Sequence, residues 1–422
     1  MTVASETASD WSRVTDEGDG RNRPVIVVGA GPVGLASALA LRARGRPVLV
    51  LEAEPEDRSR PGSRAIFVHR ESLQLLESFH AGLGRRVAAA GLVWPTRRST
   101  FRGRDVYVRT YPPPPPDRLP PSTSLPQVET ERIILEACRE AGVEIAWGSL
   151  VIDVHRDPDG VSVVTAGGTT WRAPYVIAAD GARSGVRAAL GIAMEGPRHE
   201  APFVIVDVHE LSDRPMAPER VFHYEHPGVD GRNVLLVPFA GGWRVDLQCR
   251  EEDDPEDFNS YEGVQRWLAR VIDAGYSERI AWVSTYRFLQ VLATAFTDTE
   301  RRVLLVGEAA HLFAPFGARG MNSGFADAQS AAEAVDTALG SGDREAARRA
   351  VEHFAADRRD AAEYNRAAAG AALAHMQAKD PRLRRKRRLA AAMAPFVKRA
   401  GLWLDTAPYG PTTGRGGQSG RY

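Results

Sequence analysis

The chain has 422 residues and a formal net charge of zero, with 54 basic and 54 acidic side chains. This length allows two or three domains, and the balanced charge gives no reason to expect nucleic acid or a membrane surface as a partner. No apolar run approaches the roughly 20 residues of a transmembrane helix. The N-terminus lacks the plan of a signal peptide, and the only cysteines are Cys138 and Cys249, so we expect a reduced cytoplasmic protein without a metal site.

The first 52 residues contain a polar segment and then a strand–helix–strand pattern. Residues 1–23 are polar without periodicity, which predicts a disordered lead-in. The apolar run Val25–Val28 predicts a buried strand, and an Ala- and Leu-rich helical stretch follows a glycine-rich turn. A second apolar run, Val48–Leu51, predicts another buried strand, which ends at Glu52.

The turn between the first strand and the helix has the spacing G-x-G-x-x-G, which is typical of dinucleotide binding in this context. The first glycine allows a tight turn, the second lets a pyrophosphate approach the backbone, and the third lets the helix pack on the sheet. Glu52 is expected to accept hydrogen bonds from a ribose hydroxyl. The motif does not distinguish NAD from FAD. The residues expected at the phosphates are Gly29, Gly31, Pro32, Val33 and Gly34.

The next region mixes helical, strand-like and proline-rich segments. The sequence predicts helices at 71–79 and 127–142, strands at 106–111, 143–147, 151–155 and 161–165, and an extended, exposed proline connector at 112–116. Residues 175–180 predict a buried strand that turns at Gly181 into a short helix.

The pattern changes between residues 191 and 290, where β-rich runs predict a mainly antiparallel sheet. These runs are 203–209, 220–225, 233–239, 243–249 and 284–290, with a helix at 261–274. A buried strand then returns at 303–306 and ends at Gly307 and Glu308. Helices are predicted at 321–339, 344–375 and, very basic in composition, 382–399.

Three glycine-punctuated strand ends therefore follow one another, at Gly29, at Asp180-Gly181 and at Gly307-Glu308, and the third precedes the loop PFGARGMNSG that begins at Pro315. With the β-rich insertion between them, they resemble the group A flavin-dependent aromatic monooxygenases, which have the para-hydroxybenzoate hydroxylase fold. The resemblance covers about residues 24–375.

The resemblance implies an α/β fold with a Rossmann-like FAD-binding domain and an inserted, mainly antiparallel β-sheet substrate domain. The FAD-binding domain would comprise 24–190 and 291–375, and the substrate domain 191–290. A basic C-terminal helix and tail would occupy 376–422.

The resemblance also assigns cofactor contacts. Arg64 and Gln127 match positions that contact FAD, and Asp180 and Gly181 match the motif at which the family binds FAD and NAD(P)H. Arg183 and Arg187 fall where members place nicotinamide-nucleotide contacts. Gly307 and Glu308 stand at the ribityl or ribose hydroxyls, with Glu308 in place of the commoner Asp.

The loop after Pro315 has a physical interpretation of its own. By the same resemblance, Pro315 would flank the reactive face of the flavin. On physical grounds, Arg319 is a candidate for a fixed positive charge in this loop. Consecutive N–H groups at a helix N-terminus stabilise the negative charge that reduced flavin carries at its pyrimidine end. The residues expected to present that edge are Gly317, Gly320, Met321 and Asn322.

By resemblance, NADPH or NADH reduces FAD, O₂ adds to give a C4a-hydroperoxyflavin, and a phenol or aminophenol-like substrate attacks the distal oxygen. A base is expected near the phenol, because the phenolate is more reactive. On strand 220–225, His223 and Tyr224 point to opposite faces, and either is a candidate for facing the substrate. His69 and His311 are further candidates.

The protein is expected to be a monomer or homodimer. Two alternatives stay open at this stage. One is a flavin-dependent N-hydroxylase or epoxidase, and the other is an NAD-dependent dehydrogenase without flavin.

Overall fold

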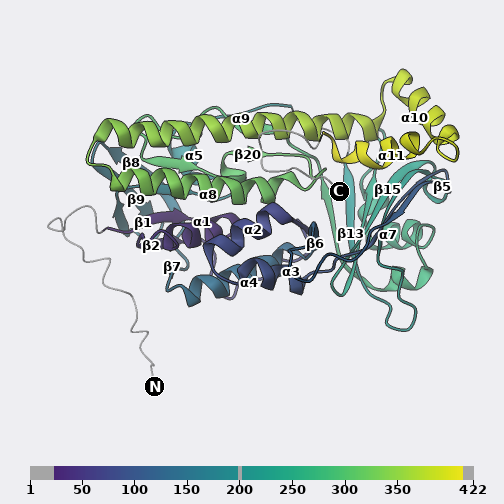
Figure 1. The fold of residues 1–422 in the computed structure, drawn as a ribbon, viewed down its shortest axis with the longest axis horizontal. Coiled ribbons are helices and arrows are strands. Elements are labelled where there is room, and N and C mark those ends of the chain that lie inside the picture. The colour runs from purple at the N-terminus through teal and green to yellow at the C-terminus, as the bar shows by residue number, and fades with distance from the viewer. Residues whose placement is uncertain (1–22, 198–201, 412–422) are drawn as a thin grey trace.

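A computed structural model describes residues 23–197 and 202–411 (Figure 1). Apart from Arg23, the predicted lead-in lies outside the described residues, as does the Gly-rich tail from Thr412. Among the described helices, none is both long enough and apolar enough to cross a membrane.

The nucleotide-binding pattern folds as a parallel five-stranded sheet in the order β19-β11-β1-β2-β7. The strands are β1 (Val25–Val28), β2 (Val48–Leu51), β7 (Glu144–Ala146), β11 (Val176–Ala178) and β19 (Val303–Leu305). Every residue of β1, β2, β11 and β19 is buried, as expected for a parallel sheet that is covered on both faces. The helices α1 (Pro32–Arg42), α4 (Gln127–Glu140) and α8 (Arg319–Gly340) pack together beside it.

Three smaller sheets surround this unit. One pairs β3 (Phe67–His69) with β6 (Ser122–Ser124). The second contains β8 (Val151–Asp157), β9 (Gly160–Thr165) and β10 (Thr170–Ala173), and the third contains β12 (Met194–Glu195), β18 (Val291–Ala293) and β20 (His311–Leu312). The remaining helices of this part are α2 (Arg70–Phe79), α3 (Leu83–Ala90) and α5 (Gly185–Ala189).

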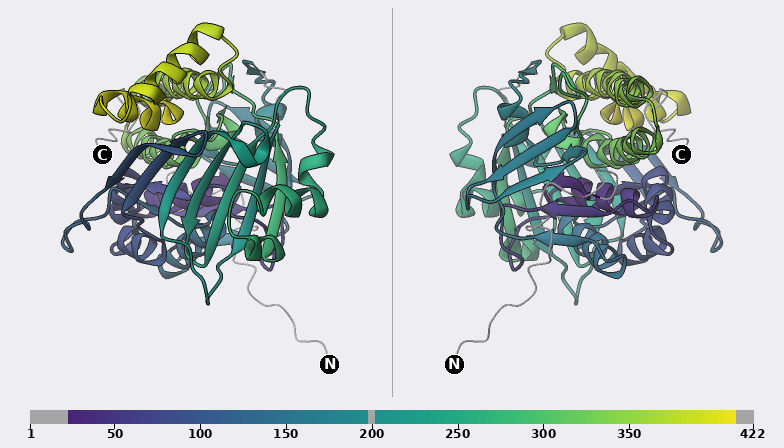
Figure 2. Two further views of the ribbon diagram at one scale, coloured as in Figure 1. Left: turned by 90° about the vertical axis from the view of Figure 1, so that its right-hand side faces the viewer. Right: turned by 90° about the vertical axis from the view of Figure 1, so that its left-hand side faces the viewer.

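The β-rich region forms a seven-stranded sheet in the order β17-β13-β16-β15-β14-β4-β5, which faces the viewer in the left view of Figure 2. Its strands are β4 (Thr96–Phe101), β5 (Arg104–Thr110), β13 (Phe203–His209), β14 (Glu219–His226), β15 (Arg232–Phe239), β16 (Gly242–Gln248) and β17 (Ile280–Tyr286). Neighbouring strands are antiparallel except β14 and β4.

This sheet extends beyond the predicted boundaries of 191–290, because β4 and β5 come from the preceding region. The sequence did not indicate β4, since two of its buried positions carry the polar residues Arg97 and Ser99. The outward face of the sheet packs on α7 (Tyr261–Leu268) around Val264 and Trp267, beside the short helix α6 (Glu256–Asn259). The sequence predicts a helix over 261–274, but α7 ends at Leu268, six residues earlier.

Helix α9 (Arg344–Gln377) runs along α8 and reaches the seven-stranded sheet, where α10 (Pro381–Met393) and α11 (Lys398–Thr406) lie (Figure 1). The prediction of one helix over 382–399 was wrong. Pro395 lies between α10 and α11, and proline inside a helix removes a backbone donor and clashes with the preceding turn.

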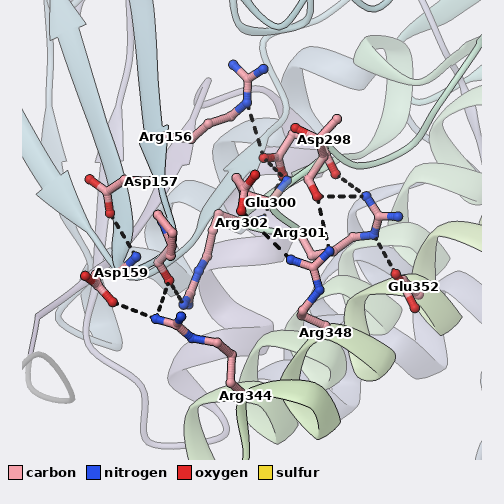
Figure 3. A network of polar contacts seen from close by, with 12 residues as sticks. Arg156, Asp157, Asp159, Asp298, Glu300, Arg301, Arg302, Arg344, Arg348 and Glu352 are labelled. Atoms are coloured by element: carbon pink, nitrogen blue, oxygen red, sulfur yellow. Dashed lines mark hydrogen bonds and ion pairs between the residues drawn. The ribbon is translucent and has the colours of Figure 1, made fainter.

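A polar network ties the β8–β9 hairpin to the start of β19 and to α9 (Figure 3). The buried carboxylate of Asp298 accepts hydrogen bonds from the backbone N–H groups of Arg302 and Val303, both at 2.8 Å, and lies 3.5 Å from Arg156. Two further ion pairs reach α9: Arg301–Glu352 at 2.9 Å and Arg344–Asp159 at 2.7 Å. This network holds β19 in register far from the cavity described next.

Candidate active site

A large cavity lies where the inward face of the seven-stranded sheet meets the carboxyl ends of the parallel strands. Its volume is about 1680 Å³. Sites for one small molecule are usually roughly 300–1,000 Å³, so this cavity has room for a dinucleotide together with a second molecule. Ligands of open α/β sheets bind outside the carboxyl ends of the strands, which is where these walls converge.

The first glycine turn has the geometry that a dinucleotide requires. A Cβ on Gly34 would lie 1.9 Å from the carbonyl oxygen of Gly29, so the third glycine brings helix and strand together as predicted. Gly29 has φ +101° at the turn out of β1. A Cβ on Gly31 would meet no atom closer than Arg60 Nη1 at 3.9 Å, which leaves this position open to the cavity.

The start of α1 completes that cradle. No side chain caps the helix and its first turn contains no acidic residue, so the partial positive charge of its N-terminus is left for a ligand. Gly29, Gly31, Pro32 and Val33 line the cavity, and Gly34 lies behind them.

Glu52 lies at the carboxyl end of β2 with its carboxylate held in place. Oε2 accepts a hydrogen bond from the N–H of Ala30 at 2.5 Å, and Oε1 accepts from the N–H of Glu54 at 3.0 Å. The residue is buried and lines the cavity. Its position fits the predicted contact with a ribose hydroxyl.

The second and third strand ends place two more carboxyl groups at the cavity. Asp180 accepts hydrogen bonds from Ser184 Oγ at 2.6 Å and from the N–H of Val186 at 3.0 Å. Gly181, with φ +81°, faces open space. Glu308 projects into the cavity from the turn at Gly307. Desolvation raises the pKa of both carboxyl groups.

The two arginines after Asp180 differ in position. Arg183 is exposed and lines the cavity. Arg187 is not among the lining residues. Its guanidinium donates to the carbonyl oxygens of Ala309 at 3.0 Å and Ala182 at 3.1 Å, so it joins α5 to the turn after β19. The structure therefore does not support the predicted nicotinamide-nucleotide contact of Arg187.

Arg64 and Gln127 both line the cavity, as the predicted FAD contacts require. Arg64 has φ +51°, and its carbonyl oxygen accepts a hydrogen bond from Arg244 Nη1 on β16. Gln127 Oε1 accepts from the N–H of Ala65 at 3.4 Å. The seven-stranded sheet thus holds the loop that carries Arg64.

The loop after Pro315 leads directly into α8. Ala318 precedes the helix with φ +52°, no side chain caps the helix, and its first turn contains no acidic residue. Pro315, Gly317, Gly320 and Met321 line the cavity. This N-terminus is suited to an anion, which fits the predicted contact with the pyrimidine end of a flavin.

Asn322 supports this loop from behind the cavity wall. Its Oδ1 accepts from the N–H of His69 at 2.9 Å and from Ser72 Oγ at 2.7 Å, and its Nδ2 donates to the carbonyl oxygens of Phe67 and Ala318 at 2.9 and 2.8 Å. Its side chain is therefore engaged by the protein, and Asn322 does not line the cavity.

Arg319 lines the cavity but is only 1% exposed. It donates to Asn365 Oδ1 at 2.9 Å and to the carbonyl oxygens of Tyr409 and Pro411 at 3.2 and 2.6 Å. All three acceptors are neutral, and burial lowers the pKa of the guanidinium. Arg319 thus combines the predicted positive charge with an anchoring contact to the C-terminal segment.

Comparison with known proteins agrees with this geometry. The family described as FAD binding domain matches residues 22–367. The chain belongs to this FAD-binding family, that of the group A flavin-dependent monooxygenases. The match removes the alternative of a dehydrogenase without flavin.

Two curated relatives illustrate the similarity. A rifampicin monooxygenase of Streptomyces venezuelae is 32% identical over 341 residues, which cover 72% of this chain and 62% of that protein. A para-nitrophenol 4-monooxygenase of Pseudomonas sp. (strain WBC-3) is 29% identical over 79% of this chain and 82% of its own length. The chain spans less than two thirds of some relatives, including 54% of a 6-methylpretetramide 4-monooxygenase of Streptomyces rimosus.

The fold agrees with solved structures. A p-nitrophenol 4-monooxygenase from Pseudomonas putida DLL-E4 superposes with a TM-score of 0.74 at 25% identity, covering 93% of this chain and 99% of that one. An aklavinone-11 hydroxylase in complex with FAD and aklavinone has the same fold, with a TM-score of 0.70 at 24% identity and coverage of 85% and 70%.

The two residues predicted to activate the substrate of this flavoprotein lie away from the cavity. Tyr224 is fully buried, with its hydroxyl 2.5 Å from the carbonyl oxygen of Leu404 and 2.9 Å from His375 Nε2. His223 occupies the opposite face of β14, where Nδ1 lies 2.8 Å from Thr100 Oγ1. Desolvation lowers the pKa of His223 to about 3 and raises that of Tyr224. Neither residue is therefore a substrate base.

The other two histidines also have structural partners. His69 lines the cavity, but its Nε2 lies 3.2 Å from the carbonyl oxygen of Gly317, and burial lowers its pKa. His311 is buried, with Nε2 2.6 Å from Asp327 Oδ2, and does not line the cavity.

The apolar wall of the cavity comes from residues that the sequence does not single out, on β13 and on the segments after β17 and β20. Phe203, Phe288 and Phe316 line the cavity as one ring cluster, with centroids 4.8 to 5.5 Å apart. The alternation along β14 was read correctly, but Phe222 rather than Tyr224 reaches the cavity. The alternation of residues along a strand predicts which side chains share a face of the sheet. It does not predict which part of that face the helices α9 to α11 cover.

Within the described residues, no group of three or more His, Cys, Asp or Glu side chains is arranged to hold a metal ion.

Proposed function

We propose that the protein is an FAD-dependent monooxygenase that uses NAD(P)H and O₂ to hydroxylate an aromatic compound of the phenol or aminophenol class. One observation carries the proposal: a single cavity joins the dinucleotide cradle, the open N-terminus of α8 and an aromatic wall. The names of the relatives, which include monooxygenases of para-nitrophenol and pentachlorophenol, support this class of reaction.

When bound, FAD supplies the redox chemistry that activates oxygen, and the residues of this chain supply binding and positioning. The backbone at Gly31 and the start of α1 would bind the pyrophosphate, and Glu52 would accept from a ribose hydroxyl. Glu308 accepts from ribityl or ribose hydroxyls. The N–H groups at the start of α8, with Arg319 beside them, would stabilise negative charge on the cofactor, and Pro315 would contact its ring.

The apolar wall excludes water from the reacting groups. Phe203, Phe288 and Phe316 form it where the seven-stranded sheet meets the loop after β20. A dry wall strengthens the electrostatic contacts inside the site and suppresses side reactions with water.

We propose Asp246 as the acceptor of the phenol proton. It lines the cavity on β16, between the apolar residues Ile205 and Leu235 of the adjacent strands. Arg244 Nε donates to its Oδ1 at 2.7 Å. Burial raises the pKa of the carboxyl group although Arg244 opposes the shift, so the ionised group is a better base than an ordinary aspartate.

Oxygenation at another atom uses the same apparatus, so N-hydroxylation and epoxidation remain alternatives. A cytoplasmic location and a monomeric or homodimeric state also belong to the proposal. The two cysteines, both buried and free, agree with a reducing compartment.

The test follows the flavin absorbance of the purified protein without oxygen, as NADPH or NADH is added with and without a panel of phenols and aminophenols. We expect one class of aromatic compound to accelerate bleaching, followed by a hydroxylated product when oxygen is admitted. A protein that cannot be reconstituted with FAD, or one whose reduction and product are independent of every aromatic compound, would refute the proposal.

A further inference from the structure

The C-terminal segment forms part of the cavity wall, although it lies beyond the family match, which ends at residue 367. Pro408 and Tyr409, in the 3₁₀ turn that follows α11, both line the cavity. The segment is closely packed on α9, since a Cβ on Gly410 would lie 2.2 Å from the carbonyl oxygen of Ala368. The segment therefore closes this part of the cavity where α11 meets the seven-stranded sheet (Figure 1).

Two arginines of the sheet bind this segment. The carboxylate of Asp405 lies 2.6 Å from Arg97 Nη2 on β4 and 2.9 Å from Arg220 Nη1 on β14. The guanidinium carbon of each arginine lies 4.8 Å from the ring centroid of Tyr409. We call Arg97, Arg220, Asp405 and Tyr409 the arginine clamp.

The clamp presents excess positive charge to the cavity. Arg97, Arg220 and Tyr409 line the cavity, whereas Asp405 is fully buried behind them. Two guanidinium groups face one carboxylate, and Arg220 is only 1% exposed. Its Nε is buried and has no hydrogen-bond partner among the residues that the structure describes. Burying an unbalanced charge costs free energy, and an anionic ligand in the cavity would offset that cost.

A third cation, Arg319, strengthens this excess of positive charge. Arg319 donates to the carbonyl oxygens of Tyr409 and Pro411, so the loop at the predicted flavin edge and the clamp hold the same stretch of chain. The three acceptors of Arg319 are neutral, so these hydrogen bonds do not offset its positive charge.

We propose that the arginine clamp is the specificity-determining end of the substrate cavity and takes a negatively charged group, such as a carboxylate, of the aromatic substrate. This inference rests on the proposed function, because it names the substrate class of the same cavity. Guanidinium groups present planar N–H pairs that match a carboxylate, and the ring of Tyr409 offers a face for an aromatic ring. Asp405 is a positioning residue, which orients both arginines and reduces the clamp's net charge to one.

A purely structural clamp would behave differently. If Arg97 and Arg220 only anchor Asp405, ligand binding would not depend on ligand charge, and every clamp variant would affect charged and neutral ligands equally. The ratio between a charged ligand and its neutral isostere therefore separates the two roles.

The experiment uses the full-length protein loaded with FAD and a matched pair of ligands, 3-hydroxy-2-naphthoate and 3-hydroxy-2-naphthamide. Calorimetric titration gives the dissociation constant of each. We expect the carboxylate to bind at least about tenfold more tightly, which corresponds to about 1.4 kcal/mol. Arg220→Met and Arg97→Met should each remove most of this preference.

Arg98→Met is the matched control. Arg98 is the next residue on β4, pairs with Glu219 and Asp105, and does not line the cavity, so the variant should keep the preference for the carboxylate.

Asp405→Asn gives a test of opposite sign. Removing the buried carboxylate raises the net charge of the clamp from one to two, so the preference for naphthoate over naphthamide should increase above that of the wild type. A preference that decreases in Asp405→Asn would support the structural role and overturn the inference. This arm also decides the matter if Arg220→Met does not fold.

Equal affinity of the wild type for both ligands, or a preference that survives in a folded Arg220→Met variant, would also overturn the inference. The proposed function fails separately. A protein that prefers naphthoate but hydroxylates no aromatic compound retains the anionic subsite without the activity, and one that hydroxylates neutral phenols without preference retains the activity without the subsite.

Discussion

The two ends of the cavity are built in different ways. At the proposed nucleotide end, the glycine turn 29–34 and the start of α1 offer backbone N–H groups, and the carboxylate of Glu52 lies beside them. At the proposed substrate end, the wall includes side chains from β4, β13, β14, β15, β16 and β17, together with Phe288, Phe316 and Tyr409 from three separate later segments.

This difference indicates which end of the cavity binds a common diphosphate group and which end distinguishes one substrate from another. A diphosphate is bound by N–H groups and a helix dipole, which any sequence with the correct glycines provides. A substrate is distinguished by particular charges and rings, and these are assembled only when distant strands meet. The nucleotide end should therefore be sensitive to added volume, and the substrate end to single functional groups.

The largest expected effect comes from adding volume at the nucleotide end. Gly31→Val introduces a side chain that the protein itself accommodates, because no protein atom lies closer than 3.9 Å to a Cβ there, but that occupies the space of the pyrophosphate. We expect a folded protein whose affinity for FAD is lower by about 100-fold or more, about 2.7 kcal/mol.

Flavin fluorescence during titration measures the affinity of Gly31→Val, and circular dichroism verifies the fold. Gly167→Val, at an exposed turn with open space around the Cβ, should bind FAD like the wild type. Normal FAD affinity in Gly31→Val would show that the pyrophosphate lies elsewhere.

The next largest effect is expected when one functional group is removed at the substrate end. Asp246→Asn should bind FAD normally but hydroxylate a neutral phenol about 100-fold more slowly, which is the usual scale of general-base catalysis. Phenols that are already ionised at the assay pH should lose much less rate. Equal losses for ionised and neutral phenols would argue that Asp246 only positions Arg244.

The pH profile provides an independent measurement on Asp246. Only the ionised carboxylate accepts a proton, and burial raises its pKa, so the wild-type rate should fall as pH decreases through a value above that of an ordinary aspartate. The acidic limb should be absent from the residual activity of Asp246→Asn. The same limb in both proteins would assign it to another group.

A smaller effect concerns the attachment of the C-terminal helices. Tyr224→Phe removes the hydroxyl that contacts Leu404 and His375, and it should lower the free energy of unfolding by about 1–2 kcal/mol. Urea denaturation measures this change. FAD affinity should stay at the wild-type value, because Tyr224 does not line the cavity.

The smallest effect tests which face of β14 serves the site. His223→Gln should change the hydroxylation rate by less than about twofold, because His223 does not line the cavity. Steady-state kinetics with the best aromatic substrate provide the measurement. A loss comparable to that of Asp246→Asn would return His223 to the site.

The local elements were largely predictable. The three buried strands Val25–Val28, Val48–Leu51 and Val303–Leu305 and the long α8 and α9 follow from uninterrupted apolar runs and helical periodicity. The break between α10 and α11 also has a local signal in the sequence, which is Pro395. Strand β4 was missed because its inward positions carry Arg97 and Ser99, whose burial depends on Asp405.

The sequence alone determined the nucleotide end, because the glycine spacing, the following helix and Glu52 lie within 28 residues and interact through the backbone. Only the tertiary structure decided the substrate end. Strand alternation gives two faces, but which face meets the cavity depends on what covers the other parts of the sheet. Tyr224 and Phe222 share a face of β14, and the packing of α9 and α11 on Tyr224 leaves only Phe222 in the cavity. Such contacts join residues about 150 to 180 positions apart, which no local pattern records.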